Sequence, residues 1–250
     1  MNIFLYQTTI ENDIQINFNH FKTIFTRNFF DLFLAPELFL TGFDYKNINT
    51  HSTKNAEYLK IIQDLCLKYN KAFCGSFFWH EKNKYFNRSF FINNKGKIIS
   101  TYDKVHLIPA LNEDKYLTAG KKEKTLLYND FLIGLSICYD LRFPEFFRKY
   151  AKKETHLIIV QAEWPKERID QMLILAKSRA LENQCWLLLT NAVNNCVEIE
   201  MGGNSIVVNP YGKVVLNLKQ SISGKSFKIA KKEVLEFRNN FNALYSFSRK

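Results

Sequence analysis

The chain has 250 residues, a formal net charge of +11, and a composition in which 46% of the side chains are hydrophobic. This length and apolar content suit a single domain over residues 1–250, and they exclude a low-complexity or repeat chain. The lysines are scattered without a groove-reading motif, and no apolar run approaches the length of a membrane span. Neither nucleic acid nor a membrane is therefore expected as a partner.

The five cysteines indicate a reducing compartment. Their number is odd, their spacing is irregular, and the first residues lack the basic start of a secretion signal. We therefore expect free thiols and a cytoplasmic location. The histidines do not cluster with the cysteines, so the sequence predicts neither a metal site nor another cofactor.

Strands and helices are expected to alternate along the chain. Short apolar runs indicate strands, and apolar residues at three- and four-residue spacing indicate helices. The expected elements are a strand at 3–7, a helix over 14–29, a strand at 32–35, a helix over 58–69, a hairpin of strands 72–78 and 85–92, a strand ending near 104, an apolar strand at 131–137, a helix over 145–152, a strand at 157–161, a helix over 167–183, a strand at 186–191 and a hairpin turning at 209–212. Hairpins combined with strand–helix–strand units predict an α/β fold with mixed sheets.

Three short segments place reactive side chains at predicted strand ends. Cys138 follows the apolar run, Glu37 follows a short apolar segment that stops at Pro36, and Lys104 ends another strand-like run. A thiol on a strand-to-helix turn can face a pocket while nearby backbone N–H groups point at a ligand. Taken alone, Cys138 fits a core position and the two charges fit ordinary surface positions. Their combination indicates a site.

The order glutamate, lysine and cysteine, each at a strand end, resembles the carbon–nitrogen hydrolase (nitrilase) superfamily over essentially the whole chain. Three further segments resemble other blocks of that family: residues 113–120, residues 162–165 with 179–184, and residues 203–212. The resemblance implies a four-layer α-β-β-α sandwich built from two mixed β-sheets. It also implies that Glu113 lies beside Lys104 and the nucleophile, although charge alone would make Glu113 an ordinary loop carboxylate.

These residue types suit the hydrolysis of a small-molecule amide through a thioester intermediate. Glu37 would take the proton of Cys138 as the sulfur attacks the carbonyl carbon, pass it to the leaving ammonia, and later activate the hydrolytic water. Lys104 and the backbone N–H of Tyr139 would form the oxyanion hole. Glu113 would orient the lysine and the substrate.

Several residues near these segments are candidates for substrate binding: Phe43, Tyr139, Arg142, Glu163 and Trp164. Arg142 lies one helical turn after the nucleophile, where it could hold a substrate carboxylate or instead pair with Glu145. The aromatic residues fit a pocket wall and a core position equally well. If Glu163 faces the pocket, it would disfavour an anionic group and favour a donor such as a carboxamide or an amine.

Residues 138–145 resemble the amidase branch that includes omega-amidases acting on 2-oxoglutaramate. The first interpretation is therefore a small-molecule amidase of that type. An N-carbamoyl-amine or N-carbamoyl-amino-acid hydrolase would use the same triad and stays open, as does a non-catalytic basic scaffold protein. The resemblance also implies a homodimer or higher homo-oligomer, to which the apolar side chains of 143–150 and the aromatic tail over 237–247 are expected to contribute.

Overall fold

Two large β-sheets and the helices outside them make up the structure, a computed structural model that describes residues 1–196, 199–222 and 224–244. The helices are α1 (Ile14–Arg27), α2 (Ile48–Tyr69), α3 (Glu113–Tyr116), α4 (Pro144–Lys152), α5 (Ile169–Glu182) and α6 (Lys231–Asn240). The strands of the first sheet are β1 (Asn2–Leu5), β2 (Leu32–Leu34), β3 (Ala72–Glu81), β4 (Lys84–Ile92), β5 (Ile98–Asp103) and β14 (Lys225–Lys228). Those of the second sheet are β6 (Lys124–Tyr128), β7 (Phe131–Ile137), β8 (Leu157–Ala162), β9 (Trp186–Asn191), β12 (Ile206–Val208) and β13 (Val214–Asn217), while β10 (Val193–Cys196) and β11 (Ile199–Gly202) pair separately.

Both sheets are mixed, and they share one plan. The first has the strand order β14-β1-β2-β3-β4-β5, and the second has the order β13-β12-β9-β8-β7-β6. In each sheet three neighbouring strands are parallel, namely β1-β2-β3 and β7-β8-β9. Antiparallel strands extend both edges of each sheet. Because the carboxyl ends of parallel strands open at one edge, this plan gathers the loops that follow them.

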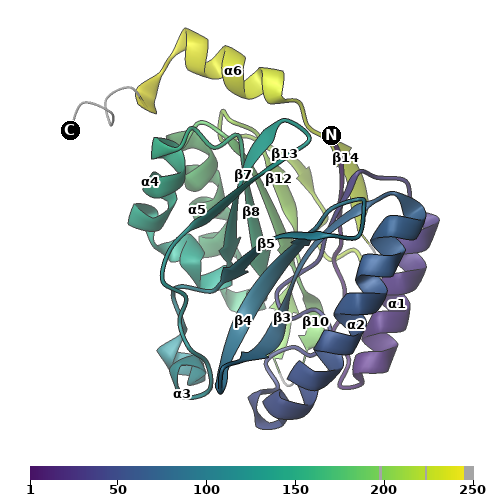
Figure 1. Cartoon of the computed structure of the whole chain (residues 1–250). Helices are drawn as coiled ribbons and strands as arrows, with labels where there is room; N and C mark the ends of the chain where they lie inside the picture. The colour runs from purple at the N-terminus through teal and green to yellow at the C-terminus, as the bar shows by residue number, and fades with distance from the viewer. Residues whose placement is uncertain (197–198, 223, 245–250) are drawn as a thin grey trace.

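The two sheets pack face to face over an apolar core. Ile3 and Leu34 from the first sheet and Ile133 and Ile159 from the second are fully buried in one hydrophobic cluster. A second cluster, rich in phenylalanine, lies between the first sheet and helices α1 and α2. Figure 1 shows α1 and α2 outside the first sheet and α4 and α5 outside the second. The expected four-layer α-β-β-α sandwich with two mixed sheets is confirmed.

Helix α2 begins ten residues before the predicted start at 58, because buried polar residues interrupt the apolar pattern of its first turns. Ser52 donates from Oγ to the Ile48 carbonyl at 2.7 Å, and Asn55 donates from Nδ2 to the Phe78 carbonyl at 3.1 Å. These hydrogen bonds allow polar side chains to face the core. Strands β6, β10, β11 and β14 and helix α6 were not predicted either, because they are short or carry charged ends.

The helix after Cys138 packs onto its own subunit. Phe146, Phe147 and Tyr150 of α4 are each at most 3% exposed, and the Tyr150 hydroxyl donates to the Leu135 carbonyl of β7. The prediction that these side chains are spare for a partner subunit is therefore wrong, since the second sheet already covers them. In the aromatic tail, the rings of Phe237 and Tyr211 lie 4.3 Å apart, whereas Tyr245 and Phe247 lie outside the described residues.

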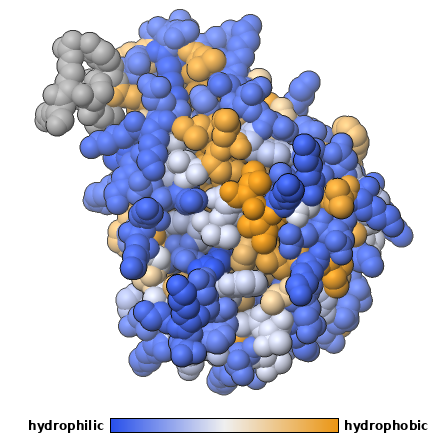
Figure 2. Space-filling model, viewed as in Figure 1, coloured by the Kyte–Doolittle hydropathy of each residue, from blue (hydrophilic) through white to orange (hydrophobic). Residues whose placement is uncertain are grey.

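The surface is mostly hydrophilic on the face drawn in Figure 2, with one apolar strip near its centre. No helix in the described part of the chain has the length and apolar character needed to cross a membrane.

Arg238 anchors α6 to the segments that follow α4 and α5, and its removal should destabilise the protein. The buried guanidinium donates to the carbonyls of Gln184, Glu154 and Thr155, at 3.2, 3.0 and 2.6 Å. Arg238→Ala leaves these acceptors without their donor, so we expect a loss of about 2–4 kcal/mol in the free energy of unfolding by urea. Lys232→Ala, on an exposed position of the same helix, is the control and should change stability by less than about 0.5 kcal/mol. Equal stability of the two variants would contradict this assignment.

Candidate active site

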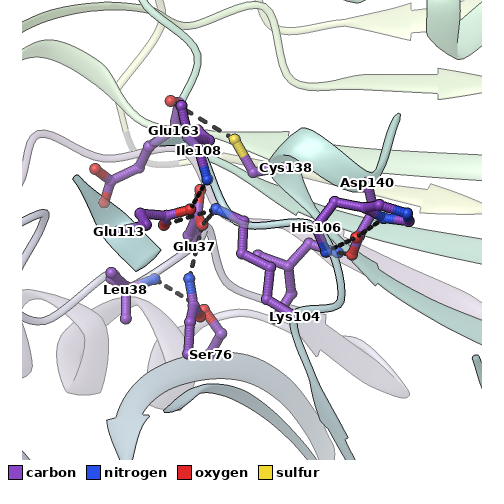
Figure 3. A network of polar contacts seen from close by, with 12 residues as sticks. Glu37, Leu38, Ser76, Lys104, His106, Ile108, Glu113, Cys138, Asp140 and Glu163 are labelled. Atoms are coloured by element: carbon purple, nitrogen blue, oxygen red, sulfur yellow. Dashed lines mark hydrogen bonds and ion pairs between the residues drawn. The ribbon is translucent and has the colours of Figure 1, made fainter. Parts of the chain in front are cut away.

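Four strand ends converge where the two sheets face each other. Glu37 lies in the turn after β2, Lys104 directly after β5, Cys138 directly after β7 and Glu163 directly after β8. Figure 3 shows these side chains in one cluster, with Glu113 of α3 beside them. Because β2 and β5 belong to the first sheet and β7 and β8 to the second, the cluster exists only when the two sheets are packed together.

The Lys104 ammonium lies between two carboxylates. Its Nζ is 2.8 Å from Glu37 Oε1 and 2.8 Å from Glu113 Oε1, and none of the three side chains is exposed. Asn87 of β4 donates from Nδ2 to Glu37 Oε1 at 2.7 Å, and the Tyr45 hydroxyl donates to Glu113 Oε1 at 3.0 Å. Charges this deeply buried require such pairing, so Glu37, Lys104 and Glu113 are held as one unit.

The segment that carries Glu113 wraps closely around the end of β5. Glu113 Oε2 accepts a hydrogen bond from the Ile108 backbone N–H at 2.7 Å, and the Gly120 N–H donates to the Lys104 carbonyl at 2.8 Å. A Cβ at Gly120 would lie 2.1 Å from the Asp103 carbonyl oxygen, so no other residue fits without a shift of the backbone. The segment is thus tied at both ends to the strand that presents Lys104.

Burial and pairing set the protonation of this unit. Burial raises the pKa of Glu37, and Lys104 opposes that shift while Glu113 adds to it. Burial alone would lower the pKa of Lys104, but the carboxylates of Glu113 and Glu37 outweigh it and raise the pKa well above its ordinary value. Lys104 is therefore a permanent cation, which cannot serve as a base near neutral pH.

Cys138 occupies a strained turn beside this unit. Its φ of 45° lies in the left-handed region, which a residue with a Cβ adopts at an energetic cost. The sulfur lies 3.9 Å from the backbone carbonyl of Glu163. Burial raises the pKa of the Cys138 thiol well above its usual value, Glu37 adds to the shift, and Lys104 opposes it. The resting thiol is thus protonated and needs a base in order to attack.

Asp140 connects the cysteine turn to the segment after Lys104. Its Oδ1 accepts from the His106 backbone N–H at 3.0 Å and lies 2.7 Å from His106 Nδ1. Its Oδ2 accepts from the Tyr102 hydroxyl at 2.6 Å and from the Ile137 N–H at 2.9 Å. One buried carboxylate therefore sets the spacing between the strand end that carries the thiol and the strand end that carries the ammonium.

A cavity of about 230 Å³ opens onto Cys138. The predicted substrate-binding residues all line it, namely Phe43, Tyr139, Arg142, Glu163 and Trp164. Ile199 and Met201 extend its apolar wall, and Glu167 and Arg168 lie at its exposed rim. Glu37, Lys104 and Glu113 lie behind this lining, so a ligand that enters the cavity meets Cys138 and Glu163 before it reaches them.

The Arg142 side chain is held at the cavity by two neighbours. Its guanidinium carbon lies 4.7 Å from the Trp164 ring centroid, and its Nη2 donates to Gln171 Oε1 at 2.8 Å. The alternative partner weighed from the sequence, Glu145, is not the residue that binds it. Trp164 in turn donates its backbone N–H to Asn191 Oδ1 at 2.7 Å, which fixes the wall on which Arg142 stacks.

Asn87, Tyr45 and Asp140 were missed in the sequence. Asn87 lies in the middle of β4, where its register partner is Phe78, and Tyr45 lies in a short turn before α2. The sequence of β4 gave no clear signal for Asn87, because Arg88 and Ser89 beside it are also polar. Asp140 could have been identified from its position two residues after the thiol, on the same turn. In the part of the chain that the structure describes, no group of three or more metal-binding side chains occurs.

Comparison with known proteins identifies close relatives. A sequence profile of the carbon-nitrogen hydrolase family matches residues 6–226. The chain is 34% identical over 214 residues to a protein named hydrolase in agr operon from Staphylococcus aureus, covering 84% of this chain and 82% of that protein. It is 29% identical over 187 residues to a 2-oxoglutaramate amidase from Bacillus subtilis, covering 74% of this chain and 72% of that protein.

The fold also matches a solved structure. A CN-hydrolase superfamily protein from Xanthomonas campestris, crystallised with an arsenic adduct in its active site, superposes with a TM-score of 0.91 at 24% identity. The match covers 98% of this chain and 96% of that chain, so the two proteins share the whole sandwich.

Removal of the Asp140 carboxylate should damage both stability and activity. Asp140→Ala leaves the Tyr102 hydroxyl and the Ile137 N–H buried without an acceptor, so the free energy of unfolding should fall by about 3–5 kcal/mol. Turnover should fall as well, because the cysteine turn is no longer tied to the segment after Lys104. Chemical denaturation and steady-state kinetics measure the two effects, with the exposed Asp64→Ala of α2 as control. Wild-type stability in Asp140→Ala would show that these bonds do not support the turn.

Proposed function

The chain belongs to the carbon–nitrogen hydrolase family, and we propose that within it the protein is an omega-amidase-like enzyme that releases ammonia from a small carboxamide. The family match and the amidase relatives support an enzyme that hydrolyses amide C–N bonds with a cysteine nucleophile. One observation carries the proposal: a fully buried ammonium, Lys104, bridges Glu37 and Glu113 beside the Cys138 thiol. That arrangement supplies a nucleophile, a base and a cation at a single point.

In the proposed first half-reaction, Cys138 attacks the carbonyl carbon of the amide. Glu37 accepts the thiol proton as the C–S bond forms, because the thiol is protonated at rest. The oxygen that gains negative charge is stabilised by the Lys104 ammonium and by the Tyr139 backbone N–H. Glu37 then gives its proton to the departing nitrogen, the C–N bond breaks, and ammonia leaves a thioester on Cys138.

In the second half-reaction, water hydrolyses the thioester. Glu37 is again a carboxylate after protonating the leaving nitrogen, so it can take a proton from the attacking water and return it to the sulfur. Glu113 keeps Lys104 in position through both halves by its 2.8 Å contact to Nζ. The same base is used twice, and the proton balance closes without a histidine.

The substrate is proposed to be a small dicarboxylic acid monoamide. The cavity of about 230 Å³ is smaller than the roughly 300–1,000 Å³ of pockets that hold drug-sized ligands. Arg142 carries five N–H donors, of which the bond to Gln171 uses one, and it is suited to a substrate carboxylate. The relative named 2-oxoglutaramate amidase supports a substrate with an amide at one end and a carboxylate at the other.

We further propose that the enzyme is cytoplasmic and works as a homodimer or higher homo-oligomer. Free, buried thiols are found at Cys66, Cys74, Cys138 and Cys185, which suits a reducing compartment. An association surface is offered by exposed apolar side chains near the end of α5, in the turn between β12 and β13, and on and directly after α6, namely Leu181, Tyr211, Leu235 and Phe241. Light scattering of the active protein at micromolar concentration should give at least a dimer mass, and a fully active monomer would refute the association.

A panel of small amides tests the activity and the nucleophile together. The wild-type protein should release ammonia fastest from 2-oxo dicarboxylic acid monoamides, and Cys138→Ala should lower turnover at least about 10³-fold because the thioester cannot form. Cys66→Ala, a buried thiol outside the site, is the control and should retain activity. Preferred turnover of N-carbamoyl compounds would point to the carbamoyl hydrolase instead. Absence of turnover on every compound would favour a non-catalytic protein.

A further inference from the structure

Glu163 is a buried carboxyl group whose two oxygens lack protein partners. The residue is 2% exposed, and among the described residues neither Oε1 nor Oε2 has a hydrogen-bond partner. Glu37 Oε2, in the same cluster, is buried without a nitrogen or oxygen partner among the described residues, while the Cys138 thiol lies within hydrogen-bonding reach of the Glu37 carboxyl group. Figure 3 shows the Glu163 side chain on the side of the sulfur where Glu37 and Glu113 lie. Carboxyl oxygens of two different side chains thus lie in one buried cluster without a nitrogen or oxygen partner among the described residues.

The lack of hydrogen-bond partners for both of its oxygens among the described residues sets Glu163 apart from the other buried carboxyl groups of the site. Both oxygens of Glu113 are hydrogen bonded, Asp140 accepts from three donors and contacts a fourth polar group, and Glu37 uses Oε1 fully. A buried polar group without a partner lowers the stability of the fold, and the described residues supply no partner to offset this cost for Glu163. Since Glu163 lines the cavity, its missing partner is one that enters from the cavity.

The surroundings of Glu163 favour its neutral form. Burial raises its pKa well above the ordinary value, the carboxylates of Glu37 and Glu113 add to the shift, and Lys104 opposes it. The other ionisable groups that face this space are Cys138 and Tyr45 within the cluster, with Arg142, Glu167 and Arg168 along the cavity. A neutral carboxylic acid keeps a carbonyl acceptor, and it places no additional negative charge beside the two carboxylates.

We propose that Glu163 is a specificity-determining residue that, together with Glu37 Oε2, binds the two N–H groups of a primary carboxamide. The assignment rests on the proposed amidase function and extends it by naming the group that selects the substrate. A primary amide brings two donors, and carboxyl oxygens with acceptor capacity lie on two different side chains, Glu163 at the cavity wall and Glu37 behind it. With one N–H on Glu37 Oε2, the proton that Glu37 takes from sulfur lies one hydrogen bond from the leaving nitrogen.

The selection follows from the donor count. An N-methyl amide has one N–H group, so it can fill Glu37 Oε2 or Glu163 but not both, and its methyl group would meet a buried polar atom. Sites built to hydrogen-bond a substrate group discriminate strongly against analogues that lack it, because the buried acceptor is then left unpaired. The enzyme should therefore prefer primary amides over their N-methyl counterparts.

Two substitutions at Glu163 test the assignment by kinetics and by stability. Glu163→Leu removes the acceptor, so kcat/KM for a primary amide should fall about 10–100-fold, whereas the value for the N-methyl amide of the same acid should fall less. Glu163→Gln keeps a neutral carbonyl acceptor of the same length and should restore most of the loss. Glu163→Leu should also raise Tm, because it replaces a buried unpaired polar group with an apolar one. A residue present for folding would lower Tm when removed.

Glu200→Leu serves as the control for the loss of one carboxyl group, since Glu200 is exposed and paired with Lys166 at 2.7 Å. It should leave the ratio of primary to N-methyl amide turnover at the wild-type value. An unchanged ratio in Glu163→Leu, or equal losses in Glu163→Leu and Glu163→Gln, would overturn the assignment while ammonia release by the wild type would still support the amidase. Absence of ammonia release from the wild type would instead reject the proposed function itself.

Discussion

The buried ammonium of Lys104 is the interaction on which the rest of the site depends. A charged lysine with no exposed surface needs partners that compensate for the lost hydration, and here the carboxylates of Glu37 and Glu113 each lie 2.8 Å from Nζ. Loss of either partner would leave an uncompensated charge in the interior, at a cost of about 3–5 kcal/mol. Neither carboxylate can therefore move without affecting the other. The contacts that stabilise the Lys104 cation also fix the position of Glu37, the base, beside the thiol.

The pairing of two mixed sheets makes this cluster possible. Glu37 and Lys104 come from the first sheet, and Cys138 comes from the second, so the reactive groups meet only across the interface between them. Direct bonds link the sheets at the same place: the Thr190 hydroxyl of β9 donates to the Ala35 carbonyl at 3.0 Å, one residue beyond β2. Face-to-face packing of the apolar core thus has a functional consequence, because it sets the distance between base and nucleophile.

Much of this arrangement could be predicted from the sequence, because its determinants are local. Glu37, Lys104 and Cys138 each follow an apolar strand, and the strand ends could be located from hydrophobic patterning without knowledge of the sheets. The family resemblance then supplied the four layers. Strand β9 was predicted with the observed bounds, 186–191, since its apolar run 186–189 is short and is followed by the polar residues Thr190 and Asn191.

What could not be predicted depends on contacts between distant parts of the chain. Strand β14 pairs with β1 across more than 220 residues, and its lysine ends resemble a surface loop. Asn87 reaches Glu37 because of the β3–β4 register, and Tyr45 reaches Glu113 from a turn without periodicity. The spare apolar face assigned to α4 was misjudged for the same reason, since the strand that buries Tyr150 cannot be identified from the helix alone.

Several energetically unfavourable features of this molecule lie in and beside the buried cluster. Cys138 has a positive φ, and Glu37 Oε2 and both oxygens of Glu163 are buried without a nitrogen or oxygen partner among the residues that the structure describes. Each of these features costs free energy. Elsewhere in the site, buried charges are paired within hydrogen-bonding distance. A ligand that brings N–H donors would pair these groups as it binds, and the relief of their unfavourable burial would contribute to its binding free energy. The unpaired polar groups therefore indicate which hydrogen-bonding groups a ligand should carry.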